Sequence, residues 1–218
     1  DLPRGKNLVG VFHQPARVII DVGTLATLPA REFSGGMAEV IKHAAIADAA
    51  MFAWLEQMDP AQLRTDVVCL RQMVARNCQL KAAVVAADPR EQGLRACLNF
   101  GHTVGHALEV AAGEWGLRHG EAVALGMVAE SRLAERLGRT TPETTARLLS
   151  LTRKWSLLAL PAGLNRTRAQ EALRHDKKFA AGQLRLPLVP ELGRVEFTDQ
   201  VPVAELAAAL DDILTAGV

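Results

Sequence analysis

Two histidines and a glutamate in separate segments have the residue types and spacing of a metal site. His102 and His106 stand four residues apart in NFGHTVGH, so a helix there would place both imidazoles on one face, toward a metal or a substrate. His119 stands in HGEAV at the start of another predicted helix, and Glu39 stands in AEVIK on a third. One glutamate and two histidines from separate helices suit a catalytic zinc ion with one open position. Simpler interpretations need no metal: a packed histidine pair, a solvated helix face for Glu39 and a helix start for His119.

Basic side chains that could bind phosphate or carboxylate are scattered along the chain. Arginine suits a planar carboxylate because its guanidinium can donate two parallel hydrogen bonds. Each residue alone is more simply explained as a surface side chain whose aliphatic part packs on the protein. Spacing does not bring them together, so a common site depends on the fold. The basic candidates are Lys6, Lys42, Lys81, Arg95, Lys177 and Lys178, and the neutral amide of Asn7 stands beside Lys6 in the sequence.

The elements that would position these residues are mostly helices. Apolar residues at three- and four-residue steps, bounded by capping residues, predict the helices. Short β-branched runs within 6–21, and later the segments LRLPLVP and RVEF, predict minor β structure near both ends. The expected fold is predominantly α. The predicted helices cover about 37–47, 48–56, 60–87, 98–112, 119–137, 142–155, 168–175 and the residues from 203 onward.

Glycines mark two places where this helical pattern needs an explanation. Ser34 to Gly36, the SGG segment, is predicted to be an N-cap and loop before the helix at 37–47. Gly101 and Gly105 fall within the predicted helix at 98–112, where each glycine costs about 0.8 to 1.0 kcal/mol relative to alanine. Tight packing or a close approach of the backbone to a ligand would explain them.

Composition narrows the classes of function. The chain has 218 residues, of which 49% are hydrophobic and 22% charged, as in an ordinary globular domain. Its 25 basic and 24 acidic residues create no broad field that would attract nucleic acid or an anionic membrane. Three cysteines without a CxxC pair argue against a disulfide framework or a thiolate zinc site. No apolar run reaches the roughly 20 residues of a membrane span, and no signal-peptide pattern is present. We therefore expect a cytoplasmic protein with no nucleic-acid or membrane partner.

Five motifs, in order, resemble the 3-dehydroquinate synthase family: GKNLVGVFHQP, LATLPAREFSGGMAEVIKHAAIAD, KAAVVAADPREQGLRACLNFGHTVGHALE, HGEAVALGMVAES and HDKK. The resemblance spans nearly the whole chain and implies the C-terminal part of a two-domain enzyme, α/β plus α. Residues 1–30 would be a strand segment left from the nucleotide-binding domain, and 31–218 the helical metal- and substrate-binding domain. The chain has no glycine-rich dinucleotide loop and begins at Asp1. We therefore expect a fragment or processed product that is inactive by itself.

The resemblance also implies which residues handle the metal and the protons. Glu39, His102 and His119 match the ligands of a zinc or cobalt ion. His106, which spacing alone would admit as a ligand, matches an acid/base histidine instead. Glu91 matches a second proton-handling group, although an exposed acid in a loop is the simpler interpretation of this residue taken alone.

The remaining site residues follow from the same resemblance. Positions that hold the substrate carboxylate and hydroxyl groups match Lys81, Arg95 and Asn99, and Lys42 is expected to face the same cavity. Substrate-phosphate contacts match Asn7 and Lys177, with Lys178 as the alternative. NAD contacts match Lys6 and the stretch Thr24, Leu25, Ala26 and Thr27.

The implied reaction converts 3-deoxy-D-arabino-heptulosonate 7-phosphate to 3-dehydroquinate and phosphate, with NAD used catalytically and a divalent metal. The expected partner is this small-molecule sugar phosphate, and the enzyme could form a homodimer. Another sugar-phosphate cyclase is the nearest alternative, because such enzymes share the metal triad; the GLRACLN and AEVIKH motifs favour dehydroquinate synthase. A metal-dependent polyol dehydrogenase would not need the phosphate and carboxylate contacts. A non-catalytic helical metal-binding domain is the alternative from another class.

Overall fold

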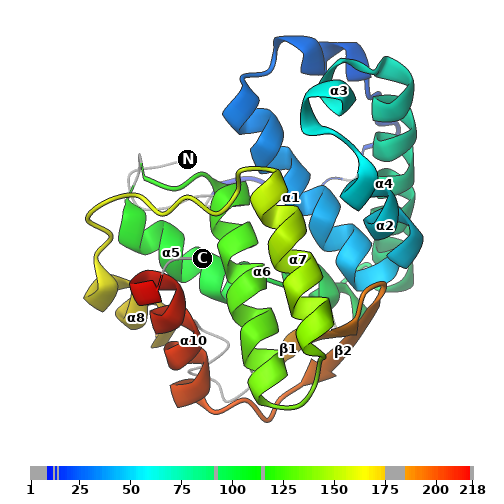
Figure 1. Cartoon of the computed structure of the whole chain (residues 1–218). Coiled ribbons are helices and arrows are strands. Elements are labelled where there is room, and N and C mark those ends of the chain that lie inside the picture. Colours follow the sequence, from blue (N-terminus) through cyan, green and yellow to red (C-terminus); the bar gives the residue numbers. More distant parts are fainter. Residues whose placement is uncertain are drawn as a thin grey trace.

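The computed structural model describes residues 9–11, 13, 15–90, 93–113, 116–174 and 185–216, and its architecture is predominantly helical (Figure 1). The expected fold class is thereby confirmed. The elements are the 3₁₀ helices η1 (Val22–Thr27) and η2 (Leu94–Asn99), the helices α1 (Ala30–Ala47), α2 (Ala49–Gln57), α3 (Pro60–Thr65), α4 (Val67–Ala87), α5 (His102–Ala112), α6 (His119–Arg136), α7 (Pro142–Lys154), α8 (Arg166–Arg174) and α10 (Val203–Ala216), and the strands β1 (Leu186–Glu191) and β2 (Arg194–Thr198).

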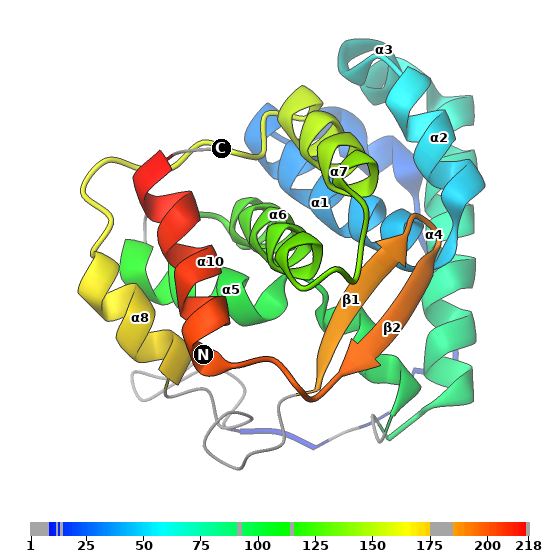
Figure 2. The ribbon, with the colours of Figure 1, turned by 60° about the horizontal axis from the view of Figure 1, so that its bottom comes forward.

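Helix α6 forms the centre of the molecule. Every residue from Gly120 to Ser131 is buried, and α6 contacts α1, α5, α7, α10 and β1. Figure 2 shows α6 surrounded by these elements. Val123 and Met127 belong to one apolar cluster, with α1 and α2, whereas Leu125 and Val128 belong to a second cluster, with α5 and α10. Residues 122–129 are apolar on every side of the helix, a pattern typical of a helix buried in the core.

Helix α1 begins earlier than the sequence predicts and runs through the SGG segment. The prediction that Ser34 to Gly36 form a cap and loop is therefore wrong. A Cβ atom added to Gly120 of α6 would lie 2.0 Å from the carbonyl oxygen of Gly35. The close contact between α1 and α6 therefore requires glycine at 120, whereas a Cβ on Gly35 or Gly36 would meet no atom within 4 Å. The SGG segment has the composition of a loop but lies inside a helix.

Two predicted helices are interrupted. The one predicted over 60–87 breaks at Asp66, whose side chain accepts hydrogen bonds from the backbone N–H groups of Val68 and Cys69 and so caps α4. The one predicted over 98–112 becomes η2 and α5, separated at Gly101, which has the left-handed φ of 79°. Gly101 also lies against Gly126, since a Cβ on Gly126 would meet the Gly101 carbonyl oxygen at 1.9 Å. Tight packing thus explains the glycine at 101.

The β structure lies near one end only of the described chain. β1 and β2 pair antiparallel, and the turn is tied to α1 by a 2.8 Å hydrogen bond from the Gly193 N–H to the Ala45 carbonyl. In contrast, the described residues between 9 and 21 form no strand, and Ile19 is 86% exposed. The strands expected within 6–21 are therefore not found in the described residues, where the segment has no neighbouring strand to pair with. No described helix is long and apolar enough to cross a membrane.

Candidate metal centre

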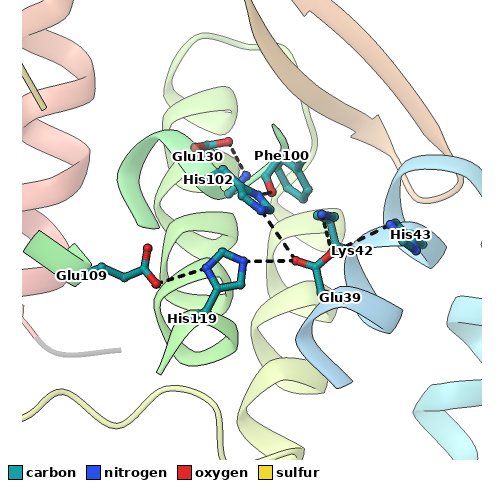
Figure 3. A network of polar contacts seen from close by, with 9 residues as sticks. Glu39, Lys42, His43, Phe100, His102, Glu109, His119 and Glu130 are labelled. Carbon is teal, nitrogen blue, oxygen red and sulfur yellow. Dashed lines mark hydrogen bonds and ion pairs between the residues drawn. The ribbon is translucent and has the colours of Figure 1, made fainter. Parts of the chain in front are cut away.

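Three helices bring Glu39, His102 and His119 to one place (Figure 3). Glu39 lies in the middle of α1, whereas His102 and His119 are the first residues of α5 and α6. The Nε2 atoms of His102 and His119 lie 3.7 and 3.8 Å from Oε1 of Glu39. One ligand atom from each residue lies within 4.8 Å of the others. The side chains therefore converge as a metal site requires, and their role as ligands stays a prediction.

The two oxygens of Glu39 have different surroundings. Oε2 accepts a 2.6 Å hydrogen bond from Nζ of Lys42, whereas Oε1 is buried and has no hydrogen-bond partner. A buried carboxylate oxygen without a partner is costly, so an oxygen of this kind calls for a missing ligand. The donors facing it are imidazole nitrogens, and one carboxylate with two imidazoles suits zinc or cobalt. The residues present thus fit a divalent transition metal.

Both histidines use Nδ1 elsewhere and leave Nε2 toward Glu39. His102 Nδ1 lies 3.2 Å from the Phe100 carbonyl oxygen, and His119 Nδ1 lies 3.1 Å from Oε1 of Glu109. Burial and then the nearby Lys42 charge lower the pKa of His102 to about 4, so this imidazole is neutral at pH 7 and free of a competing proton. The hydrogen bond to Glu109 raises the pKa of His119, against the opposing effect of burial.

A buried cation and a third imidazole lie beside Glu39. Lys42 is 2% exposed; burial lowers its pKa, and the attraction of Glu39 opposes that effect. Burial disfavours the charged form of Glu39, but the charge and hydrogen bond of Lys42 prevail and hold the pKa of Glu39 below its ordinary value. His43 is also buried; its Nδ1 lies 2.7 Å from Oδ1 of Asn77, and its Nε2 lies 3.9 Å from Oε2 of Glu39. Burial, followed by the Lys42 charge, lowers the pKa of His43.

His106 lies next to both histidines of the site, on the solvent side. Its ring centroid is 5.4 Å from that of His102 and 6.2 Å from that of His119, and the residue is exposed. Together with Glu109 and His119, it forms a second group whose ligand atoms also lie within 4.8 Å of one another. The acid/base role expected for His106 stays a prediction.

The expected substrate residues differ in how near to Glu39 they are placed. Lys42 lies at the centre itself, and the charge of Lys81, an exposed residue of α4, lowers the pKa of Lys42. Arg95, in η2, donates a 3.2 Å hydrogen bond to the Pro89 carbonyl of the neighbouring loop. Asn99 ends η2 and is half-buried. The contacts described here place Lys42 at Glu39, Lys81 is linked to the centre only through its charge effect on Lys42, and Arg95 and Asn99 lie on the adjoining segment.

The stretch expected to contact NAD, Thr24 to Thr27, lies in the 3₁₀ helix η1. The Thr24 hydroxyl donates to the Asp21 carbonyl, and the Thr27 hydroxyl donates to the Thr24 carbonyl. Leu25 and Ala26 lie between them in the same helix. Four further expected residues, together with the alternative Lys178, lie outside the described residues: Lys6, Asn7, Glu91 and Lys177.

Two carboxylates that our sequence analysis did not select support the starts of the histidine-bearing helices. Glu130 of α6 is fully buried and accepts hydrogen bonds from the N–H groups of Gly101 at 2.7 Å and Val104 at 3.4 Å, so it supports the first turn of α5. Glu121, in the first turn of α6, accepts two hydrogen bonds from Arg31 of α1, at 2.6 and 2.7 Å. Glu121 also accepts the Arg118 N–H at 2.9 Å in the first turn of its own helix, a local capping signal, whereas no local pattern marks Arg31 or Gly101 as partners on other elements.

The cavity of about 500 Å³ between α2 and α4 lies apart from the metal centre. Its lining includes Met51, Trp54, Met73 and Arg76. None of the expected site residues is among the residues that line it.

Comparison with known sequences relates the chain to one enzyme family. A family model described as 3-dehydroquinate synthase C-terminal matches residues 36–179, and one described as 3-dehydroquinate synthase N-terminal matches residues 1–35. The 3-dehydroquinate synthase of Pseudoalteromonas atlantica is 44% identical over 210 residues, which cover 96% of this chain and 59% of that protein. That of Xanthomonas axonopodis pv. citri is 47% identical over 217 residues, which cover 97% and 58%. The chain thus spans less than two thirds of the length of these relatives.

Comparison with solved structures shows that sugar-phosphate cyclases share the fold of this chain. The 2-epi-5-epi-valiolone synthase ValA of Streptomyces hygroscopicus subsp. jinggangensis 5008, solved with NAD+ and Zn2+ bound, has a TM-score of 0.83 and 30% identity, covering 96% of this chain and 59% of that one. A 2-deoxy-scyllo-inosose synthase complexed with carbaglucose-6-phosphate, NAD+ and Co2+ has a TM-score of 0.81, covers 100% of this chain and 60% of that one, and at 24% identity supports the fold alone. Because the C-terminal family model matches most of the chain and its relatives share nearly half of the aligned residues, the chain belongs to the 3-dehydroquinate synthase family.

Proposed function

We propose that this chain supplies the metal- and substrate-binding part of a 3-dehydroquinate synthase. The complete enzyme converts 3-deoxy-D-arabino-heptulosonate 7-phosphate to 3-dehydroquinate and phosphate, a phosphate-eliminating cyclisation. The observation that carries the proposal is the buried, unpartnered Oε1 of Glu39, which faces Nε2 of His102 and of His119. Membership of the family supports the choice of reaction.

Glu39, His102 and His119 are the proposed ligands of a zinc or cobalt ion. When bound, such an ion polarises a coordinated substrate oxygen as a Lewis acid. Lys42 holds the other oxygen of Glu39, which orients the carboxylate and keeps it ionised. His102 is neutral because burial lowers its pKa to about 4, so it offers a lone pair at neutral pH.

The other roles follow the family resemblance. His106 and Glu91 are the residues proposed to transfer protons. His106 lies exposed beside the two proposed histidine ligands. Lys42 places positive charge beside Glu39, where an anionic substrate would bind, and the charge of Lys81 acts on Lys42. We propose that the carboxylate and hydroxyl groups of the substrate bind Lys42, Lys81, Arg95 and Asn99, and that its phosphate binds Asn7 and Lys177.

NAD+ would be held mainly by residues other than those described here. The hydroxyl protons of Thr24 and Thr27 are donated to the backbone carbonyls of Asp21 and Thr24. When bound, NAD+ accepts a hydride from the substrate and later returns it. We propose that Lys6 and residues 24–27 line one edge of that site. Residues 1–30 would belong to the nucleotide-binding domain and 31–218 to the helical domain of a cytoplasmic enzyme.

Phosphate release tests the proposal. The full product of the gene, loaded with Zn2+ or Co2+ and NAD+, is expected to release phosphate from 3-deoxy-D-arabino-heptulosonate 7-phosphate. Glu39→Gln, His102→Ala and His119→Ala should each lose metal affinity by about 100-fold or more, because each removes one of the few protein ligands. Glu143→Gln, on the exposed start of α7, is the matched control.

Two other results would redirect the proposal. Release of phosphate only from sugar phosphates that lack a carboxylate would identify a different sugar-phosphate cyclase. Tight metal binding by the full gene product without phosphate release from any sugar phosphate would support a non-catalytic metal-binding domain.

A further inference from the structure

We propose that Glu109 is a positioning residue of the metal centre, which holds the imidazole of His119 so that Nε2 points at the metal. The inference rests on the proposed metal site at Glu39, His102 and His119. It concerns a side chain that would touch neither the metal nor the substrate, and it goes beyond the ligand set itself.

The contacts of His119 carry the argument (Figure 3). Nδ1 lies 3.1 Å from Oε1 of Glu109, and Nε2 lies 3.8 Å from Oε1 of Glu39, so the ring spans two carboxylates. A ring nitrogen that donates its proton to a carboxylate leaves the other nitrogen with a lone pair, and it also makes that nitrogen a better ligand. The Glu109 contact thus selects both the tautomer and the orientation that a metal beside Glu39 requires.

His119 needs this support more than His102 does. The His119 side chain is 52% exposed, whereas that of His102 is 15% exposed. Packing therefore restrains the ring of His102, and the Phe100 carbonyl accepts its Nδ1 proton at 3.2 Å. The ring of His119, at the first position of α6, has less packing to restrain it. Its ring also contacts the rings of His102 and His106, at centroid distances of 5.3 and 6.2 Å, but these contacts do not select which ring nitrogen faces Glu39. The hydrogen bond to Glu109 can select it, and it restrains the rotamer as well.

Helix α5 is a suitable element for this role because it already carries His102. Glu109 lies seven residues after His102, so both side chains project from the same side of α5, two turns apart. The backbones of α5 and α6 approach closely, since a Cβ on Gly105 would lie 3.0 Å from the Ala122 carbonyl oxygen. Helix α5 would thus supply one ligand directly and hold the ligand of α6 in place.

A competing arrangement uses Glu109 as a ligand. His106, Glu109 and His119 form a group with ligand atoms within 4.8 Å, and a metal there would bind Nδ1 of His119. Binding in that position would replace the proton that Nδ1 shares with Glu109, and it would leave Oε1 of Glu39 without a partner. The positioning role gives a partner to Oε1 of Glu39, which is the metal, and to Oε1 of Glu109, which is the Nδ1 proton of His119. The two arrangements predict different results for the variants below.

The test is Co2+ titration of the protein, followed by visible absorption, in Glu109→Leu and Glu109→Gln. Glu109→Leu is expected to weaken Co2+ binding by about 10- to 100-fold, with the shape of the absorption band unchanged because the ligands remain. Glu109→Gln keeps an acceptor oxygen and is expected to recover most of that loss. Glu135→Leu, which removes a half-exposed glutamate elsewhere on α6, should bind Co2+ as the unaltered protein does. Long-range ¹H–¹⁵N NMR of the Zn2+ form should show the proton of His119 on Nδ1.

Several results would overturn the inference. Unchanged Co2+ affinity in Glu109→Leu would exclude a positioning role. An equal loss in Glu109→Gln would show that the charge matters and the hydrogen bond does not. A changed absorption band would make Glu109 a ligand. If Glu39→Gln and His102→Ala keep full Co2+ affinity, the proposed metal centre itself fails, whatever Glu109 does.

Discussion

Lys42 is a buried ammonium group whose stability depends on one carboxylate. Its Nζ donates to Oε2 of Glu39 at 2.6 Å, and its side chain is 3% exposed, against 32% for Glu39. Removing one partner of a buried ion pair leaves an uncompensated charge, whereas replacing both with apolar groups is often neutral. The pair therefore serves the site more than it serves the fold.

Lys42→Met is expected to lower the free energy of unfolding by about 2 kcal/mol, because the partly buried carboxylate of Glu39 then loses its cationic partner. The double variant Glu39→Leu/Lys42→Met should regain most of that loss and bind no Co2+. Urea unfolding measures the first effect and a cobalt titration the second. A double variant no more stable than Lys42→Met would contradict this account of the pair.

Asp48 joins three helices and gives the stability of the chain a predictable dependence on pH. It follows α1, caps α2 by accepting the Met51 N–H at 2.9 Å, and accepts hydrogen bonds from Nε and Nη2 of Arg76 in α4. The hydrogen bond from Arg76 lowers the pKa of Asp48, and the N–H of Met51 adds to this against the effect of burial. A carboxyl whose folded pKa is depressed stabilises the protein above its unfolded pKa, here 3.8, and loses that contribution as the pH falls through the folded value.

Asp48→Asn keeps the cap but removes the charge. We expect a loss of about 1 kcal/mol at pH 7, as for an ion pair near the surface combined with a charged hydrogen bond. The difference from the unaltered protein should shrink as the pH is lowered below 3.8. Urea midpoints measured between pH 7 and pH 2.5 test this, and a difference that does not change with pH would refute it.

At the scale of elements, glycines decide how closely the helices of the site approach. A Cβ on Gly126 would meet the Gly101 carbonyl oxygen at 1.9 Å, whereas a Cβ on Gly36 would have no atom within 4 Å. Gly126→Ala must therefore push α5 from α6 and is expected to cost about 2 kcal/mol or more. Gly36→Ala, in the open middle of α1, should stabilise the protein by about 0.5 to 1 kcal/mol through helix propensity. Thermal unfolding compares the two, and equal effects would mean that the close contact does not control the packing.

At the scale of the whole molecule, the described residues hold the proposed metal site but only one edge of the proposed NAD site. The metal ligands and Lys42 lie in the described helices, whereas the stretch expected to contact NAD forms only the short helix η1. We therefore expect the 218-residue chain to bind Co2+ and to release no phosphate from 3-deoxy-D-arabino-heptulosonate 7-phosphate, with or without NAD+. Phosphate elimination would need NAD+ to oxidise a substrate hydroxyl to a carbonyl, which stabilises the neighbouring carbanion. A metal cannot replace this oxidation, because polarising a hydroxyl does not create a carbonyl. A phosphate assay on the 218-residue chain tests this, and robust turnover by the chain alone would refute it.

Local patterns in the sequence determined most of the helices and the ligand types. The starts of α3, α6 and α7 at residues 60, 119 and 142 were all predicted, because capping residues and apolar periodicity act within a few residues of the chain. The motif order also determined the family. The sequence alone could not show that SGG lies inside α1, because a run of serine and glycine is typical of a loop, and the partner that packs on it, Gly120 of α6, is far away in the sequence.

Only the tertiary structure decided which side chains meet. Periodicity placed His102 and His106 on one helix face, but the packing of α1 against α6 brings Glu39 to Nε2 of His102 and His119 and leaves His106 outside. Glu109 was not selected for the same reason, since its partner His119 is on another helix. Hydrogen bonds and metal coordination act over about 2 to 3 Å, and in a bundle such distances between helices are set by side-chain packing. No single segment of the sequence determines the packing between helices, and therefore no single segment determines which side chains form the site.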